Sequence, residues 1–163
     1  MYKETKTQKI TRLAIIASLY VLLTIAFSFM SYGDIQVRIA EVLVLLCFFR
    51  KDYAIGLIIG CILSNLFSPF GIIDVIIGSI ATGIALVGVM HSKKLWIACI
   101  WPVLANAILI GLEISYIDNI PFYLPMITVG IGETIAMIVG YFIMNNLRKN
   151  KAFMKLIGAN QNK

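Results

Sequence analysis

Six apolar stretches separated by short polar connections dominate the pattern along the chain. They cover residues 13–29, 35–49, 53–66, 72–90, 95–114 and 123–144. An α-helix rises about 1.5 Å per residue, so a hydrocarbon core about 30 Å thick needs roughly 20 apolar residues. The pattern therefore predicts an all-α integral membrane protein, folded as a compact bundle of six transmembrane helices.

The second and third stretches, 35–49 and 53–66, are short for a complete crossing of the membrane. Only Arg50, Lys51 and Asp52 connect them. They are either full spans in a locally thinned bilayer or a tight helical hairpin that reaches part-way across. The sequence leaves both possibilities open.

The composition agrees with a membrane protein and disfavours other classes. Of the 163 residues, 60% are hydrophobic and 13% are charged, whereas soluble domains carry about 25% charged residues. We expect one membrane domain over 1–163 in the cell membrane, with basic tails at 1–12 and 147–163. The net charge of +6 does not indicate nucleic-acid binding, because Lys and Arg lie almost entirely in the termini and short connections.

The positive residues also predict the orientation of the bundle. Lys and Arg occur in both tails and in the connections around 50–52 and 91–94, whereas the connections 67–71 and 115–122 contain none. Short connections rich in Lys and Arg stay in the cytoplasm. With six spans and cytoplasmic N- and C-termini, every connection that contains Lys or Arg lies in the cytoplasm, and the connections without them lie outside.

Seven polar residues inside the apolar stretches are the candidates for a binding site. They are Arg38, Glu41, Asn65, Asp74, Asn106, Glu113 and Glu133. A charge near the bilayer centre costs roughly 2.5–3.5 kcal/mol on insertion scales, so such residues usually mark a pathway or a binding site. In the predicted topology they gather toward the outer side, which predicts a polar pocket that opens outward above an apolar floor.

Structural explanations stay open for several of these residues. Asp74 and Glu113 could be solvated near the interface or could cap helices. Arg38 and Glu41, three residues apart, could neutralise one another on one helix face. Glu133 is harder to explain in this way, because it lies about ten residues inside the last stretch with no Lys or Arg nearby in sequence.

Small residues recur at spacings that let membrane helices pack closely. Such residues are Gly56 and Gly60 in the third stretch, Gly78, Ser79, Thr82 and Gly83 in the fourth, and Gly132, Ala136 and Gly140 in the sixth. We interpret these as packing seams within the bundle. A further patch in the first stretch, Ala14, Ala17 and Ser18, could pack internally or face a partner protein.

The residues needed for catalysis or nucleotide hydrolysis are missing from the sequence. The single histidine, His91, lies in a basic connection, and Cys47, Cys61 and Cys99 fall in separate stretches without a CxxC spacing. There is no GxxxxGK[ST] phosphate-binding motif. We therefore expect no metal and no enzyme activity, and the energy for uphill transport would have to come from a partner or an ion.

Residues 35–41 read Ile-Gln-Val-Arg-Ile-Ala-Glu, and residues 65–74 join the third and fourth apolar stretches. The first segment resembles the signature IQxRIxE of the QueT transporter family, and the second resembles the segment that joins the third and fourth spans of that family. Residues 102–107 and 130–133 also fit later spans of the family. The resemblance covers roughly residues 10–146.

The resemblance implies a substrate-binding S component of an energy-coupling factor (ECF) transporter for queuosine precursors, 7-deazaguanines such as preQ0 and preQ1. Its partners would be a T component and two ATPase subunits, which would use ATP, so the chain itself would need no cofactor. S components often carry AxxxA in the first span, where it contacts the T component. The nearest match here is Ala14-xxx-Ser18, which makes Ala14, Ala17 and Ser18 the candidate partner-binding residues.

The charge inventory is compatible with that ligand class. One cation, Arg38, faces four carboxylates, so three negative charges are in excess and would suit a cationic ligand. Three alternatives remain: an S component for another vitamin or nucleobase, an ion-coupled secondary carrier with Glu133 as the titrating group, and an intramembrane enzyme. The last lacks a nucleophile–base pair or a metal cluster.

Overall fold

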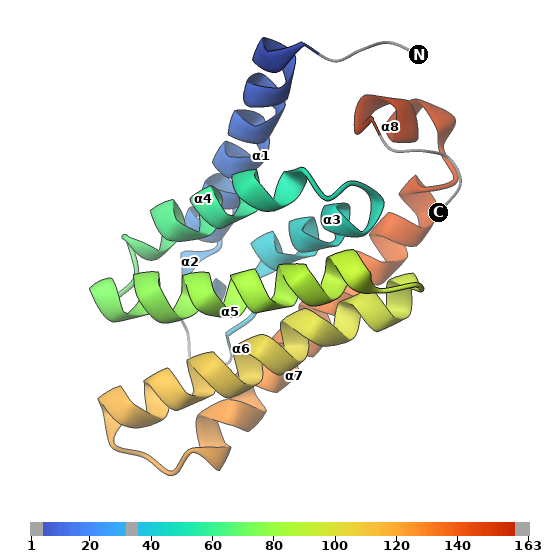
Figure 1. Ribbon diagram of the computed structural model, residues 1–163. Helices are drawn as coiled ribbons and strands as arrows, with labels where there is room; N and C mark the ends of the chain where they lie inside the picture. Colours follow the sequence, from blue (N-terminus) through green and yellow to red (C-terminus); the bar gives the residue numbers. More distant parts are fainter. Residues whose placement is uncertain (1–4, 32–35, 159–163) are drawn as a thin grey trace.

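The computed structural model describes residues 5–31 and 36–158, and its regular elements are helices (Figure 1). In chain order they are α1 (Lys6–Ala26), α2 (Ser28–Ser31), the 3-10 helix η1 (Ile39–Leu45), α3 (Leu46–Phe49), α4 (Tyr53–Asn65), α5 (Ile72–His91), α6 (Leu95–Asp118), α7 (Tyr123–Leu147) and α8 (Lys151–Leu156). The predicted all-α class is confirmed.

Four helices are long and apolar enough to cross a membrane, which makes the chain a multi-pass membrane protein. They are α1, α5, α6 and α7, with 21, 20, 24 and 25 residues. The two remaining predicted spans are the shorter apolar helices Ile39–Phe49 and Tyr53–Asn65. At about 2.0 Å per residue in a 3-10 helix and 1.5 Å in an α-helix, each is about 20 Å long, less than the hydrocarbon thickness. Six complete spans therefore stay a prediction.

The second predicted span begins differently from the prediction. Its expected first residue, Ile35, lies outside the described residues, and residues 36–38 are not helical. The backbone N–H of Val37 donates to the carbonyl of Met30 at 2.9 Å, which ties this segment to α2. The segment also lies directly on α7, where a Cβ at Gly132 would be 2.1 Å from the carbonyl oxygen of Gln36. These contacts leave Ile39 as the first residue of η1.

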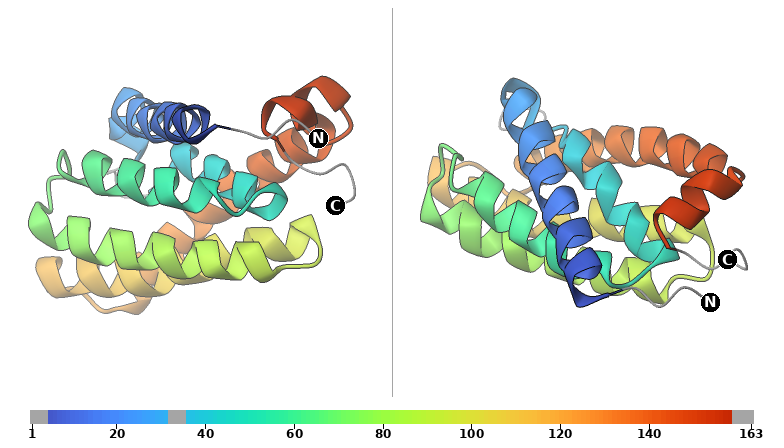
Figure 2. Two further views of the ribbon diagram at one scale, coloured as in Figure 1. Left: turned by 45° about the horizontal axis from the view of Figure 1, so that its top comes forward. Right: turned by 90° about the horizontal axis from the view of Figure 1, so that it is seen from above.

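The short helices η1 and α3 occupy the middle of the molecule, between α1 and α7 (Figure 2). α5, α6 and α7 pack against one another in chain order, and α4 packs between α5 and α1. Nine residues of η1 and α3 are buried, which are Ala40, Glu41, Val42, Val44, Leu45, Leu46, Cys47, Phe48 and Phe49. A segment that is apolar on nearly all sides belongs in the interior.

The predicted packing seams are confirmed at several glycines, where a side chain would collide with a neighbouring backbone or side chain, but not at Gly83, where a Cβ would meet nothing within 4 Å. A Cβ at Gly56 of α4 would lie 2.7 Å from the carbonyl oxygen of Leu13 in α1. A Cβ at Gly60 would lie 3.0 Å from the carbonyl oxygen of Ala17. In α7, Gly140 faces Leu45 of η1 in the same way, at 3.1 Å. Small residues thus let α1 approach α4, and η1 approach α7.

The beginning and the end of the described chain meet at the α3–α4 connection. Arg12 of α1 lies 3.6 Å from Asp52, measured from Nη2 to Oδ2. The Tyr53 hydroxyl donates to the carbonyl oxygen of Ile157 at 3.2 Å, and Arg50 Nη1 donates to that of Gly158 at 3.3 Å. Both ends of the described chain therefore lie at the basic end of the bundle. That this end is cytoplasmic stays a prediction.

Two features near the helix ends differ from the prediction. α6 continues past residue 114 to Asp118 and ends where Asn119 adopts the left-handed conformation, with φ 52° and ψ 41°. The basic tail contains a further helix, α8, whose N-terminus is capped by the Asn150 side chain. Met154 and Ile157 of this segment are buried against the bundle, so part of the tail belongs to the fold.

Candidate functional site

The structure brings the seven predicted polar residues into the interior of the bundle. Arg38 and Glu41 come from the start of η1, Asn65 from α4, Asp74 from α5, Asn106 and Glu113 from α6, and Glu133 from α7. None of the seven is more than 4% exposed. We call this set the polar cluster. Hydrogen bonds among them join the start of η1 to α5, α4 to α5, and α6 to α7.

A buried ion pair joins η1 to α5. Arg38 Nη2 lies 3.2 and 3.3 Å from the two carboxylate oxygens of Asp74. Arg38 precedes η1 in an extended conformation and forms this ion pair with another helix, so its charge does not serve Glu41 alone. Asp74 is 1% exposed, so it is not a solvated interfacial residue.

Asn65 anchors the first turn of α5 beside this ion pair. Its Nδ2 donates to the backbone carbonyl of Asp74 at 3.0 Å. Gly78 makes room for the amide, because a Cβ there would lie 2.3 Å from Asn65 Nδ2. The amide orientation leaves Asn65 Oδ1 pointing away from this bond as an acceptor.

Glu41 is held by two hydroxyl groups that were not predicted to belong to the site. The Tyr20 hydroxyl of α1 donates to Glu41 Oε1 at 2.5 Å, and Thr82 Oγ1 of α5 donates to the same oxygen at 3.4 Å. Tyr20 is 1% exposed. The available signal was a tyrosine midway along an apolar stretch, because a buried hydroxyl usually has a hydrogen-bond partner.

Asn106 and Glu133 form a second pair across α6 and α7. Asn106 Nδ2 donates to Glu133 Oε1 at 2.7 Å. Gly132, the residue before Glu133, contacts the backbone at Gln36. The Asn106–Glu133 pair is therefore close in sequence to the point where the non-helical residues 36–38, which we call the extended segment, cross α7. Asn106 Oδ1 and Glu133 Oε2 are left as two neighbouring acceptors.

The polar cluster has more hydrogen-bond acceptors than the donors around it can satisfy. Six buried acceptor atoms have no hydrogen-bond partner among the described residues: Glu41 Oε2, Asn65 Oδ1, Asn106 Oδ1, both oxygens of Glu113, and Glu133 Oε2. A buried unsatisfied acceptor costs roughly 1–3 kcal/mol, more when charged. The cluster is therefore complementary to a small molecule rich in N–H donors and unfavourable for an anion. In the described ranges, no group of three His, Cys, Asp or Glu residues is placed to hold a metal ion.

The cluster is enclosed, whereas an outward-opening pocket was predicted. Its seven side chains are all nearly inaccessible to solvent.

The candidate partner-binding residues of α1 separate onto two faces. Ala17 is 6% exposed and packs against Gly60 of α4, so it serves the internal seam. Ala14 and Ser18 are exposed. Of the patch, only these two are accessible to another protein.

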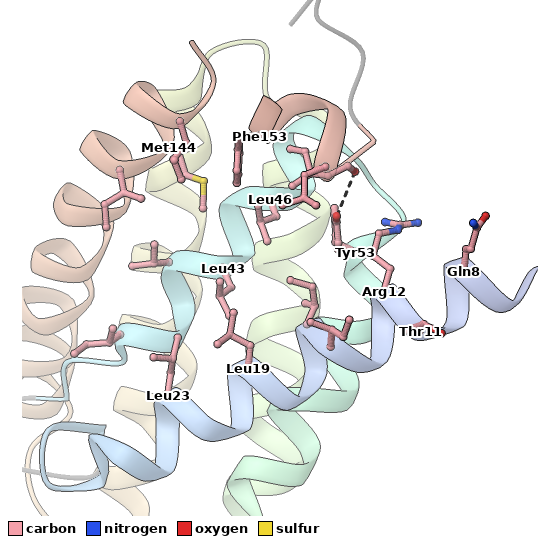
Figure 3. Close-up of a pocket in the computed structure, with 18 of the residues that line it drawn as sticks. Gln8, Thr11, Arg12, Leu19, Leu23, Leu43, Leu46, Tyr53, Met144 and Phe153 are labelled. Carbon is pink, nitrogen blue, oxygen red and sulfur yellow. Dashed lines mark hydrogen bonds between the residues drawn. The ribbon is translucent and has the colours of Figure 1, made fainter. Parts of the chain in front are cut away.

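A separate cavity of about 750 Å³ lies between α1 and α7, over η1 and α3, and is closed at one end by α8 (Figure 3). Its walls are mainly apolar side chains, among them Leu19, Leu23, Leu43, Leu46 and Met144. Polar side chains, including Gln8, Thr11 and Arg12, occur at the end near the α1 N-terminus. We call this cavity the apolar groove. It contains none of the seven residues of the polar cluster.

A multi-pass helical membrane protein with an enclosed, acceptor-rich polar site has the architecture of a small-molecule transporter. The comparisons with known proteins agree. The chain belongs to the QueT transporter family, whose model matches residues 10–149. This confirms the resemblance inferred from the sequence segments.

A similar protein in Lactococcus lactis subsp. cremoris (strain MG1363) is named "Queuosine precursor transporter QueT". The two are 36% identical, over 90% of this chain and 96% of the relative. No solved structure matches the chain significantly. Membership of a transporter family favours transport over catalysis.

Proposed function

We propose that this chain is the substrate-binding S component of an ECF transporter, and that its polar cluster captures a queuosine precursor of the 7-deazaguanine class. Family membership and the name of the Lactococcus relative support the ligand class. The observation that carries the proposal is the set of buried acceptors without partners, because a 7-deazaguanine presents several N–H donors on one rigid ring.

The neighbouring acceptors of α6 and α7 suit the guanine-like edge of such a ring. That edge carries a ring N–H next to an exocyclic NH₂, and a carboxylate can accept from both. Glu133 Oε2 and Asn106 Oδ1 are available, and the 2.7 Å bond between the two side chains fixes their separation. Asn65 Oδ1 is a further acceptor from α4. We assign the ring edge to Glu133 and Asn106.

The buried ion pair has a structural role in this proposal. Arg38 and Asp74 neutralise each other and join η1 to α5 beside the site. Glu41, fixed by Tyr20 and Thr82, places a negative charge between α1 and the site. The excess of carboxylates over Arg38 makes the interior selective for neutral or cationic ligands.

Energy for uphill transport would come from partner subunits. The sequence contains no phosphate-binding motif of the GxxxxGK[ST] type, so we assign ATP hydrolysis to two ATPase subunits. A membrane-embedded T component would connect them to this chain. The exposed face of α1 at Ala14 and Ser18 is our candidate contact, because small side chains allow close helix approach.

The test separates binding from transport. The purified chain should bind a 7-deazaguanine, detected by native mass spectrometry and calorimetric titration, but should not accumulate it in liposomes. Adding the T component and ATPases of the same organism, with ATP, should give uptake. Accumulation by the lone chain driven by a pH or Na⁺ gradient would instead establish a secondary carrier, and a vitamin adduct would establish a different ligand.

A further inference from the structure

Glu113 differs from the other carboxylates of the polar cluster in having no hydrogen-bond or ion-pair partner among the residues that the structure describes. The others are engaged: Asp74 by Arg38, Glu41 by Tyr20 and Thr82, and Glu133 by Asn106. Neither oxygen of Glu113 has a hydrogen bond or ion pair among the described residues, although the residue is only 4% exposed. The suggestion that Glu113 is a solvated interfacial residue is therefore not supported.

The charges around Glu113 do not compensate it. Arg38, the cation of the polar cluster, forms its ion pair with Asp74, and the described residues place no cation in an ion pair with Glu113. A carboxylate removed from water without a donor or a cation is costly. The position is thus prepared for a positive charge that brings its own N–H donors.

A primary ammonium group meets both requirements. It carries one positive charge and three N–H donors, so it can bond both oxygens of one carboxylate. A nitrile at the same position carries no charge and only accepts hydrogen bonds. Glu113 can therefore distinguish ligands that share one ring and differ in this substituent.

We propose that Glu113 is the counter-ion for a primary ammonium group on the ligand, which makes it the residue that selects 7-aminomethyl-7-deazaguanine over uncharged 7-deazaguanines. This inference rests on the function proposed above. It divides the cluster into a ring subsite at Asn106 and Glu133 and an amine subsite at Glu113. Both subsites lie on α6, seven residues apart and thus about two helical turns, with α7 completing the first.

The experiment compares two probes, 7-aminomethyl- and 7-cyano-7-deazaguanine, by calorimetric titration of the purified chain. The wild-type protein should prefer the amine by about tenfold or more, since a charge-assisted bond is roughly twice as strong as a neutral one. Glu113→Gln should reduce this preference by about tenfold or more. Glu133→Gln is the matched control, and it should weaken both probes together, leaving their ratio within about threefold.

The failures of the two proposals are distinguishable. If the wild-type protein binds neither probe, the proposed function is wrong. If it binds both equally, or prefers the nitrile, the function stands and the role of Glu113 is overturned. Equal loss of both probes in Glu113→Gln also overturns that role. Should Glu113→Gln fail to fold, Glu113→Asp keeps the charge and must keep a preference for the amine, and the wild-type ratio decides independently.

Discussion

The polar cluster and the apolar groove both border η1, yet they are built in opposite ways. Glu41 turns toward the cluster, where the polar residues are at most 4% exposed. Leu43 faces the groove, whose other walls include Ile15 at 60%, Ile143 at 43% and Leu156 at 79% exposed. One short helix thus separates a sealed polar interior from an open apolar surface.

The difference follows from the bilayer as a solvent. Apolar side chains gain little by leaving lipid, because lipid tails are as apolar as leucine. The groove can therefore stay open, whereas charged groups in hydrocarbon must be enclosed and paired. Stability and ligand selectivity should depend strongly on the cluster and weakly on the groove.

The largest expected effect is the loss of the only cation in the cluster. Arg38→Ala would leave Asp74 buried without its partner, and breaking a buried pair costs roughly 3–5 kcal/mol. We expect a strongly lowered thermal stability in detergent and no measurable ligand binding. Leu19→Ala, in the groove and 37% exposed, is the control and should change stability by roughly 0.5 kcal/mol or less.

A double variant sharpens this prediction. Replacing both members of a buried ion pair with apolar residues is often neutral for stability. Arg38→Met combined with Asp74→Leu should therefore recover most of the stability lost in Arg38→Ala, without recovering the affinity. Equal stability losses in Arg38→Ala and Leu19→Ala would contradict the contrast between the two regions.

The second largest effect concerns the contact between the extended segment and α7. Gly132→Ala would place a Cβ 2.1 Å from the carbonyl oxygen of Gln36, so the backbone must move. We expect a loss of roughly 1–3 kcal/mol of stability, and weaker ligand binding because Glu133 would shift. Gly130→Ala, on the same helix, meets its nearest neighbour at 3.4 Å and is the control.

Thermal unfolding measures the stability of the two variants, and calorimetric titration measures their affinity for the ligand. Alanine is a better helix former than glycine, so Gly130→Ala should be neutral or slightly stabilising. A Gly132→Ala protein as stable and as tight-binding as Gly130→Ala would show that the extended segment is not held against α7 as described.

The membership of the polar cluster could be predicted from the sequence because charge is conspicuous in apolar stretches. Asp74 and Glu133 were identified in this way, and the glycine seams followed from their spacing. The partners could not be predicted, since Arg38 and Asp74 are joined by tertiary packing across 36 residues. Tyr20 was missed for a related reason: a tyrosine in a membrane helix equally indicates an interfacial position.

The local form of the second span was also beyond prediction. Its residues are apolar on nearly all sides, so they carry no periodicity that separates a 3-10 helix from an α-helix. Its start depends on contacts with Met30 and Gly132, which are distant in the sequence. The apolar groove left no signal either, because its lining residues resemble any lipid-facing residues.

A third prediction asks which face of α1 meets a partner. Ser18 is exposed outside the groove, whereas the adjacent Leu19 lines it. Ser18→Phe should weaken co-purification with the T component by about tenfold, because a bulky residue prevents close helix approach. Ligand binding by the isolated variant should be unchanged. If Leu19→Phe, rather than Ser18→Phe, disrupts assembly, then the groove is the partner surface.

The smallest expected effect lies at the basic end of the groove, where Asp52 holds α1. Its Oδ2 is 3.7 Å from Lys9 Nζ, 3.6 Å from Arg12 Nη2 and 3.2 Å from Arg50 Nη2. Partial burial alone would raise the pKa of Asp52, but the hydrogen bond from Arg50 and the three positive charges outweigh it. The pKa therefore lies below its ordinary value of 3.8.

Because the folded state lowers this pKa, the carboxylate contributes stability above the unfolded-state value, and the contribution is lost as the pH falls through the folded-state value. Asp52 is 37% exposed, so Asp52→Asn should cost less than about 1 kcal/mol at neutral pH. The stability deficit of Asp52→Asn relative to wild type should persist down to about pH 4 and disappear below it.

The control is Asp118→Asn at the opposite end of the bundle, where the described residues offer no ion pair, so no loss of stability is expected. Thermal unfolding of the three proteins across pH 3–7 tests this, and a deficit that grows on acidification would mean that Asp52 does not hold α1 through its charge.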